Sequence, residues 1–160
     1  MTTKVRNVLA VAANASKVGY VFLIDGTPYD WEISLQANES TKAAHQFTTE
    51  WIAYYQPELL VTERIQSNSQ KGERSRDLID AIWKAAQDAE IRWACVDRVQ
   101  TFPNKYIEAA VLAERFPELM AWLPKTRTLW DEEPRRMIIF EALALGLSVT
   151  DGTGEADTVS

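Results

Sequence analysis

The sequence predicts an α/β protein with a five-stranded mixed sheet, three antiparallel strands then two parallel ones, and helices on both faces. Three β-prone segments precede the first helical period, and two later apolar strands each follow a helical segment. Strands entered through a helix need a crossover connection and so run parallel, whereas tightly joined strands are antiparallel. A chain of 160 residues, 46% of them hydrophobic, suits one compact domain, which we expect to span residues 1–147.

The three opening strands are predicted at Val5–Ala13, Lys17–Ile24 and Tyr29–Leu35. All three are rich in β-branched, aromatic or small apolar residues. Asp25-Gly26 lies between the second and third strands and is a strong signal for a tight hairpin. These segments therefore predict an antiparallel half-sheet.

The next segments alternate helix and strand. Apolar residues at helical spacing predict a first helix that stops before Pro57, and Leu59–Thr62 is a short apolar strand that runs into Glu63. A second helix over Leu78–Ala89 leads into a fifth strand at Ile91–Val96. Both of these later strands are thus predicted to run parallel in the sheet, each entered through a helical crossover connection.

The remaining chain is predicted to be helical, with a polar end. Helical patterns cover residues 104–116 and 117–124, and Asp131-Glu132-Glu133-Pro134 resembles a helix start with an acidic cap and a first-turn proline. That last helix should reach about Leu147. Residues 148–160 have no apolar period, so we expect a disordered tail.

Composition restricts the possible cellular compartments and binding partners of the protein. A single cysteine, Cys95, excludes an intrachain disulfide, and no apolar run reaches the ~18–20 residues of a membrane span, so we expect a cytoplasmic protein. The formal net charge of -6 is unlike that of a generic nucleic-acid coat protein. Any nucleic acid must then be held by a local basic patch or through carboxylate-bound metal ions.

Three segments carry a resemblance to a known family. Ala10–Phe22 has a small-residue turn followed by the pair Gly19-Tyr20, Pro57–Glu63 is an apolar strand ending in glutamate, and the chain later reads DEEPRRMIIFEALALGL. In this order they resemble the RuvC-type Holliday-junction resolvases and their phage relatives, members of the ribonuclease-H-like superfamily. The resemblance covers roughly Val8 to Leu147 and implies a ribonuclease-H-like fold.

The resemblance implies Mg²⁺- or Mn²⁺-dependent phosphodiester hydrolysis, in which two ions roughly 3.5–4 Å apart are held by carboxylates from several elements. It assigns metal-binding roles to Glu63 and to the acidic cluster, with Asp131 and Glu133 the first choices and Glu132 beside them. Glu141 matches a possible second carboxylate of the last helix, and a paired surface glutamate is the alternative.

One position departs from the family. The first catalytic aspartate should fall at Ala13, counted back from Gly19, or at Ala12 if a residue is inserted in the turn. Alanine offers no lone pair to a metal, so the nuclease should be inactive or impaired. Two explanations stay open: natural loss in a degenerate relative, or an Asp→Ala change introduced to trap a complex or silence toxicity.

The implied partner is branched DNA, and resolvases that cut symmetric junctions imply a homodimer. The candidate phosphate contacts are Lys71, Arg74, Arg76 and Lys105, for which a solvated, charged helix start is the alternative. A different function also remains open. The chain would then be a non-catalytic descendant that serves as a nucleic-acid-binding or protein-interaction module.

Overall fold

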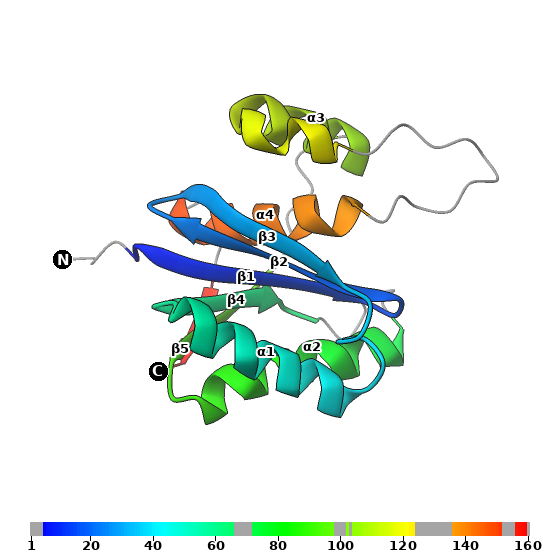
Figure 1. The fold of residues 1–160 in the computed structure, drawn as a ribbon, viewed down its shortest axis with the longest axis vertical. Helices are drawn as coiled ribbons and strands as arrows, with labels where there is room; N and C mark the ends of the chain where they lie inside the picture. Colours follow the sequence, from blue (N-terminus) through cyan, green and yellow to red (C-terminus); the bar gives the residue numbers. More distant parts are fainter. Residues whose placement is uncertain are drawn as a thin grey trace.

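A computed structural model describes residues 5–65, 72–97, 102, 104–123, 136–151 and 156–159 of the chain. One sheet with the strand order β3-β2-β1-β4-β5-β6 forms its centre, and helices cover both faces (Figure 1). The predicted mixed sheet is confirmed: three antiparallel strands are followed by two parallel ones. A sixth short strand joins at the far edge.

The antiparallel half consists of β1 (Asn7–Asn14), β2 (Lys17–Ile24) and β3 (Thr27–Ser34). Asp25 and Gly26 turn the chain between β2 and β3 with φ angles of 52° and 77°. Positive φ at both central residues is the geometry that Asp-Gly favours in a two-residue hairpin, because it matches the twist of the strands. The predicted hairpin is therefore confirmed.

The parallel half consists of β4 (Leu59–Glu63) and β5 (Arg92–Val96). β4 lies beside β1, with Val8 opposite Leu59 and Ala10 opposite Val61. β1 is thus the central strand, antiparallel to β2 on one side and parallel to β4 on the other. The carboxyl ends of β1, β4 and β5 consequently meet at one edge of the sheet.

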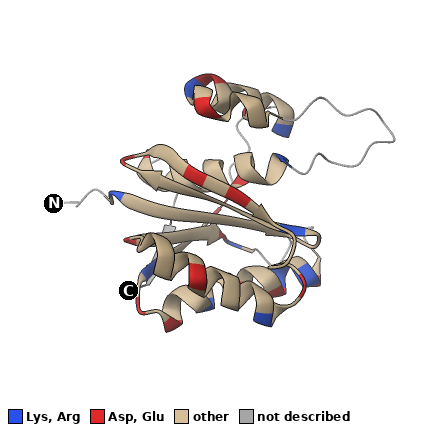
Figure 2. Ribbon diagram, viewed as in Figure 1, with Lys and Arg blue, Asp and Glu red and all other residues tan. Residues whose placement is uncertain are grey.

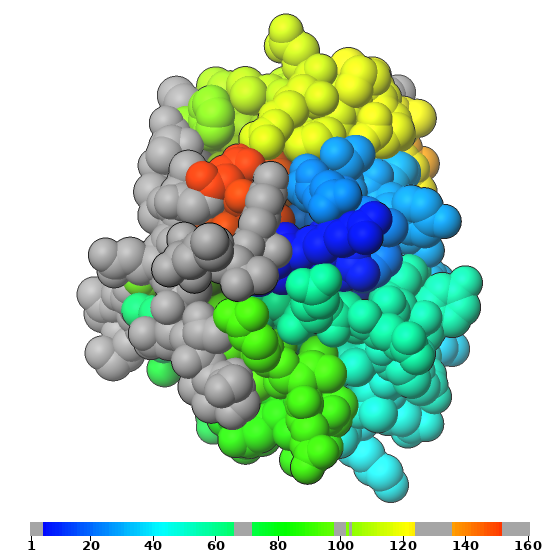
Figure 3. Space-filling view, turned by 90° about the vertical axis from the view of Figure 1, so that its left-hand side faces the viewer, coloured from blue at the N-terminus to red at the C-terminus, as the bar shows by residue number. Residues whose placement is uncertain are grey.

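Two apolar layers hold the helices to the sheet. Helices α1 (Thr41–Tyr55) and α2 (Glu73–Asp88) cover one face, and α4 (Met137–Thr150) lies on the other beside α3 (Lys105–Arg115) and the 3₁₀ helix η1 (Pro117–Trp122). Seen from the end at which β1 begins, α1 and α2 lie on one side of the sheet, and α4 followed by α3 and η1 lies on the other (Figure 3). No helix in the described part of the chain is long and apolar enough to cross a membrane.

The end of the chain differs from the expectation. We expected the last helix to stop near Leu147 and residues 148–160 to be disordered, but α4 continues to Thr150, and Ala156–Val159 form β6, antiparallel to β5. Without β6, β5 would present a row of unpaired backbone groups at the edge of the sheet. Backbone pairing needs no apolar period, which is why the pattern of the sequence did not reveal this strand. The predicted helix start at residues 131–134 lies outside the described residues.

Candidate functional site

The carboxyl ends of the parallel strands define the candidate site, which we call the carboxyl edge: Ala12 and Asn14 of β1, Glu63 and Arg64 at the end of β4, and Asp97 after β5. Crevices at the carboxyl ends of strands are the usual binding sites of open α/β sheets. The first turn of α4 lies at this end, since Ile138 packs so closely on Gly19 of β2 that a Cβ there would lie 2.7 Å from its Cγ2 atom (Figure 1).

The alternation of side chains separates the two alanines that could mark the missing aspartate. Ala12 belongs to the apolar layer beneath α4, whereas Ala13 belongs to the layer beneath α1 and α2. Leu59 and Val61 also face α4, so Glu63, two residues further, shares that face. Ala13, our first choice from the sequence, therefore does not face the same layer as Glu63, and Ala12 does.

The strand register bears on the position of Ala12 relative to Glu63. Ala10 and Val61 are the last paired residues of β1 and β4, and continuing this parallel register by two residues would bring Ala12 opposite Glu63. The buried Thr62 hydroxyl donates to the Val11 carbonyl oxygen at 2.9 Å, which holds β4 against β1 beyond their last paired residues. Neighbouring strands lie about 4.8 Å apart, so a carboxylate at position 12 would be a close neighbour of Glu63.

Arg64 and Asp97 form a second feature of the carboxyl edge, one that sequence reasoning missed. The Arg64 Nη1 atom lies 3.3 Å from Asp97 Oδ2, and its Nη2 donates to the Cys95 carbonyl oxygen at 3.4 Å. Both side chains are half-buried at the ends of adjacent strands. A carboxylate directly after the predicted strand Ile91–Val96 was the available signal, but its partner depends on the pairing of β4 with β5.

Glu141 is buried in the α4 helix and is paired. Its Oε1 atom lies 3.1 Å from the Nζ of Lys105, the first residue of α3. Glu141 lies one turn beyond Ile138, which seats α4 on the sheet near the carboxyl edge. The interpretation of Glu141 as a paired residue is supported, although the side chain is buried rather than at the surface.

The described residues do not fit a two-metal centre. Position 12 offers a methyl group where a bridging carboxylate would be required, and the Glu141 carboxylate already has an ammonium partner. Within the described ranges, no three His, Cys, Asp or Glu side chains are grouped so that they could hold a metal ion. The predicted ligands Asp131, Glu132 and Glu133 lie outside those ranges, so their role stays a prediction.

The predicted phosphate contacts have varied surroundings. Arg74 is exposed and donates from Nη2 to the Asn38 carbonyl oxygen at 2.7 Å, Arg76 is half-buried, and Lys105 is paired with Glu141. Lys71 lies outside the described residues. Basic segments at the β1–β2 turn and at the starts of α2, α3 and α4 gather toward the carboxyl edge (Figure 2). Acidic residues, among them Glu73 in the first turn of α2 and Glu108 in the first turn of α3, lie at the same helix starts, so this end of the molecule carries both signs of charge.

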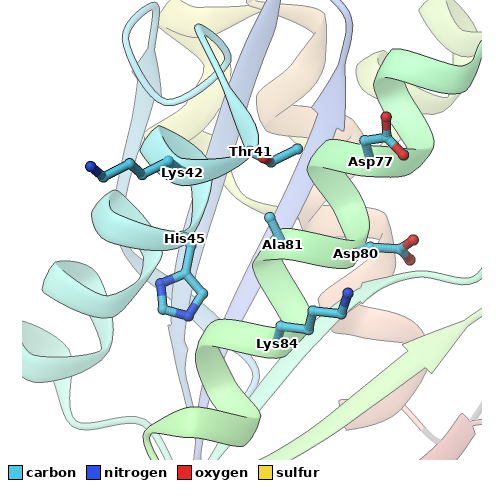
Figure 4. A pocket seen from close by; sticks show the side chains of 7 residues that line it. All are labelled: Thr41, Lys42, His45, Asp77, Asp80, Ala81 and Lys84. Atoms are coloured by element: carbon cyan, nitrogen blue, oxygen red, sulfur yellow. The ribbon is translucent and has the colours of Figure 1, made fainter.

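A separate cavity of about 380 Å³ lies between α1 and α2, where His45 and Lys84 project from opposite walls (Figure 4). Its lining carries both signs of charge, and it contains none of the residues predicted for the site. His45 is itself paired with Asp88, with 2.7 Å between Nε2 and Oδ2. This cavity is therefore distinct from the carboxyl edge.

The chain has the ribonuclease-H-like fold of the RuvC-type resolvases. RuvC of Thermus thermophilus is similar with a TM-score of 0.66 and 14% identity, over 94% of this chain and 99% of that one. The same RuvC in complex with Holliday junction substrate gives a TM-score of 0.59, at 15% identity, over 95% and 99% of the two chains.

The resolvase of fowlpox virus, solved with Holliday junction DNA, is also similar, with a TM-score of 0.56 and 14% identity over 91% of this chain and 99% of that one. No family model and no curated protein sequence matches the chain. The chain therefore shares the fold of these resolvases at low sequence identity.

Proposed function

We propose that this protein binds branched DNA across its carboxyl edge as a RuvC-like resolvase whose Mg²⁺- or Mn²⁺-dependent cleavage is impaired, because Ala12 replaces a metal-binding aspartate. The observation that carries the proposal is that Ala12 and Glu63 lie at the carboxyl ends of the adjacent parallel strands β1 and β4, on the face of the sheet that α4 covers. Two carboxylates at these positions would lie side by side at the end of adjacent parallel strands. That is the arrangement which the family resemblance implies for metal-dependent hydrolysis.

A homodimer is part of the proposal. A four-way junction is itself symmetric, and two coordinated cuts require two sites held in a fixed relation. The net charge of -6 disfavours non-specific DNA binding, so the individual basic side chains at the carboxyl edge would have to supply the attraction. Similar structures solved with Holliday junction DNA support this choice of partner.

Junction binding is tested by fluorescence anisotropy with a labelled four-way junction and a linear duplex of equal length. We expect tighter binding to the junction and a log Kd that depends linearly on log salt concentration. Replacing Arg74 or Arg76 by Gln should weaken binding and lower that salt slope by about one for each lost phosphate contact. Sedimentation of the same complexes reports whether two copies bind one junction.

Arg92→Gln is the matched control, because Arg92 is an exposed arginine at the amino end of β5, the opposite edge of the sheet. This variant should bind as the unaltered protein does. Equal affinity for junction and duplex, or affinity that does not change with salt, would contradict the proposal. Absence of binding at low salt would favour the alternative function, a protein-interaction module without a nucleic-acid partner.

A further inference from the structure

Two tyrosine rings project from the surface at the outer strand of the sheet. Tyr54 is 79% exposed and Tyr29 is 70% exposed, which makes them the most exposed large hydrophobic side chains of the described residues. Tyr29 lies in β3, the edge strand, and Tyr54 lies in the last turn of α1. Tyrosine is enriched at protein interfaces, because its ring offers apolar area and its hydroxyl stays wet. These two rings therefore mark a candidate interaction surface.

Buried and half-buried rings connect the two exposed ones. The Tyr29 ring contacts Phe22 edge to face, with 6.4 Å between the ring centroids, and Phe22 stacks on Tyr55 at 4.6 Å. The Tyr54 ring meets Tyr55 edge to face at 4.8 Å. Phe22 belongs to the apolar layer beneath α1, so the row is anchored in the core. Rings that are already held in place lose less conformational freedom when a ligand binds.

Carboxylates border this row of rings. Asp30 lies opposite Phe22 and Glu32 lies opposite Tyr20 in the pairing of β3 with β2, so both project on the face of the sheet that α1 covers. Asp30 accepts a hydrogen bond from the Tyr55 hydroxyl, and Glu32 accepts one from the Tyr20 hydroxyl at 3.1 Å. Both residues are nevertheless exposed. A carboxylate has about four lone-pair sites, so each can accept further hydrogen bonds from a ligand.

Glu50 adds a third exposed carboxylate. It lies four residues before Tyr54 in α1, so the two side chains share one face of the helix. Acidic segments are visible on both β3 and α1 (Figure 2). Across the described ranges, no lysine or arginine forms an ion pair with Asp30, Glu32 or Glu50. This surface thus combines exposed aromatic rings with negative charge that has no cationic partner within those ranges.

We propose that the tyrosine-carboxylate face, formed by Tyr29, Asp30 and Glu32 of β3 and by Glu50 and Tyr54 of α1, docks an arginine-rich segment of a partner protein. A guanidinium group can stack on a tyrosine ring and donate hydrogen bonds to a carboxylate at the same time, which suits this mixture of side chains. The carboxylates repel phosphate groups, which disfavours nucleic acid as the occupant. The face shares no residue with the carboxyl edge, so the inference goes beyond the proposed function and does not depend on DNA binding.

The probe is a fluorescein-labelled peptide of six arginines, compared with a peptide of six lysines by fluorescence anisotropy at fixed ionic strength. We expect the arginine peptide to bind roughly threefold more tightly or better, because the lysine ammonium lacks a planar group that stacks on a ring. Tyr54→Leu keeps an apolar side chain but removes the ring, and it should weaken binding of the arginine peptide about two- to fivefold. Because Tyr54 is highly exposed, this variant should melt at nearly the temperature of the unaltered protein.

Asp30→Asn combined with Glu32→Gln removes the two β3 charges and keeps oxygens that can accept the tyrosine hydrogen bonds. It should weaken binding of the arginine peptide roughly three- to tenfold. Glu114→Gln combined with Glu118→Gln is the matched control, since these exposed glutamates lie in α3 and η1, on the other side of the sheet, and alter the net charge equally. The control should bind within about twofold of the unaltered protein, because distant charges are screened by salt.

Several results would overturn the inference: no binding of the arginine peptide, equal affinity for the two peptides, or unchanged binding by Tyr54→Leu. Equal weakening in the two charge variants would also overturn it, because binding would then follow net charge alone. A labelled single-stranded oligonucleotide is titrated in parallel. If Tyr54→Leu weakens its binding and leaves that of the arginine peptide unchanged, the rings serve base stacking instead. If the variant of Asp30 and Glu32 does not fold, the comparison of Tyr54→Leu with the unaltered protein decides.

Discussion

Tyr20 joins the outer strands of the sheet to α1 through its hydroxyl group. The hydroxyl lies 3.1 Å from Glu32 Oε2 on β3 and 2.8 Å from the Tyr55 hydroxyl on α1, and Tyr55 in turn donates to Asp30. Burial raises the pKa of Tyr20 to about 12, and the neighbouring carboxylates act in the same direction. Burial and the hydrogen bond to Asp30 raise the pKa of Tyr55 as well.

This network predicts a loss of stability in alkaline solution. A tyrosine in the unfolded chain releases its proton near pH 10, before the folded one does, so the unfolded state gains stability as the pH rises. Urea unfolding should therefore show full stability below about pH 10 and a decline between about pH 10 and about pH 12.

Tyr20→Phe should lower the free energy of unfolding at neutral pH by about 1 kcal/mol, the net worth of a hydrogen bond. It should also make the alkaline decline shallower, without abolishing it, because Tyr55 still titrates. An alkaline decline equal to that of the unaltered protein would show that Tyr20 is not part of it.

The sequence alone could not decide which of two alanines corresponds to the aspartate that the family resemblance implies. Counting back from Gly19 gave Ala13 or Ala12, and a shift of one residue in a strand moves a side chain to the opposite face. Only the sheet register and the two apolar layers favour Ala12. The position of Glu63 at the end of an apolar strand, by contrast, could be predicted and is found in β4, while its role as a metal ligand stays a prediction.

At the scale of elements, α4 depends on close contact with the sheet. A Cβ at Gly146 would lie 2.5 Å from Leu23 Cδ1 and 3.1 Å from the Ala10 Cβ, so the helix backbone approaches β1 and β2 directly. This contact seats the later part of α4 on the sheet, while Ile138 in its first turn packs on Gly19. The helix position is therefore set by small residues, not only by the apolar ones.

Gly146→Ala should destabilise the protein although alanine is the better helix former. The usual gain of about 1 kcal/mol in a helix is outweighed by overpacking, and we expect a net loss of about 1–3 kcal/mol in urea unfolding. Gly72→Ala is the control, because a Cβ there meets nothing within 4 Å. Equal stability of the two variants would mean that α4 can move away from the sheet without cost.

The sequence predicted the positions of the strands better than it predicted which residues of distant segments contact one another. Turn chemistry at Asp25-Gly26 and short apolar runs located the first five strands, because these signals are local. The pairs Arg64–Asp97 and Lys105–Glu141 depend on which strands and helices become neighbours. Such contacts between distant segments leave no periodic signal in either segment.

At the scale of the molecule, the carboxyl edge carries both basic and acidic residues. Acidic residues dominate the total of -6, yet the starts of α2, α3 and α4 bring basic residues to the carboxyl edge (Figure 2). Because the net charge of the chain repels DNA, the proposed DNA binding would depend on these basic side chains.

The central claim is that Ala12 occupies a metal-ligand position beside Glu63. It is tested most directly by comparing Ala12→Asp with Ala13→Asp in a four-way junction cleavage assay with Mn²⁺, alongside the melting temperature of each variant. Both substitutions place the same carboxylate in β1, but on opposite faces of the sheet. We predict that Mn²⁺ raises the melting temperature of Ala12→Asp and gives junction cleavage, and that it does neither for Ala13→Asp. Cleavage by Ala13→Asp alone, or no effect of Mn²⁺ on Ala12→Asp, would contradict the claim.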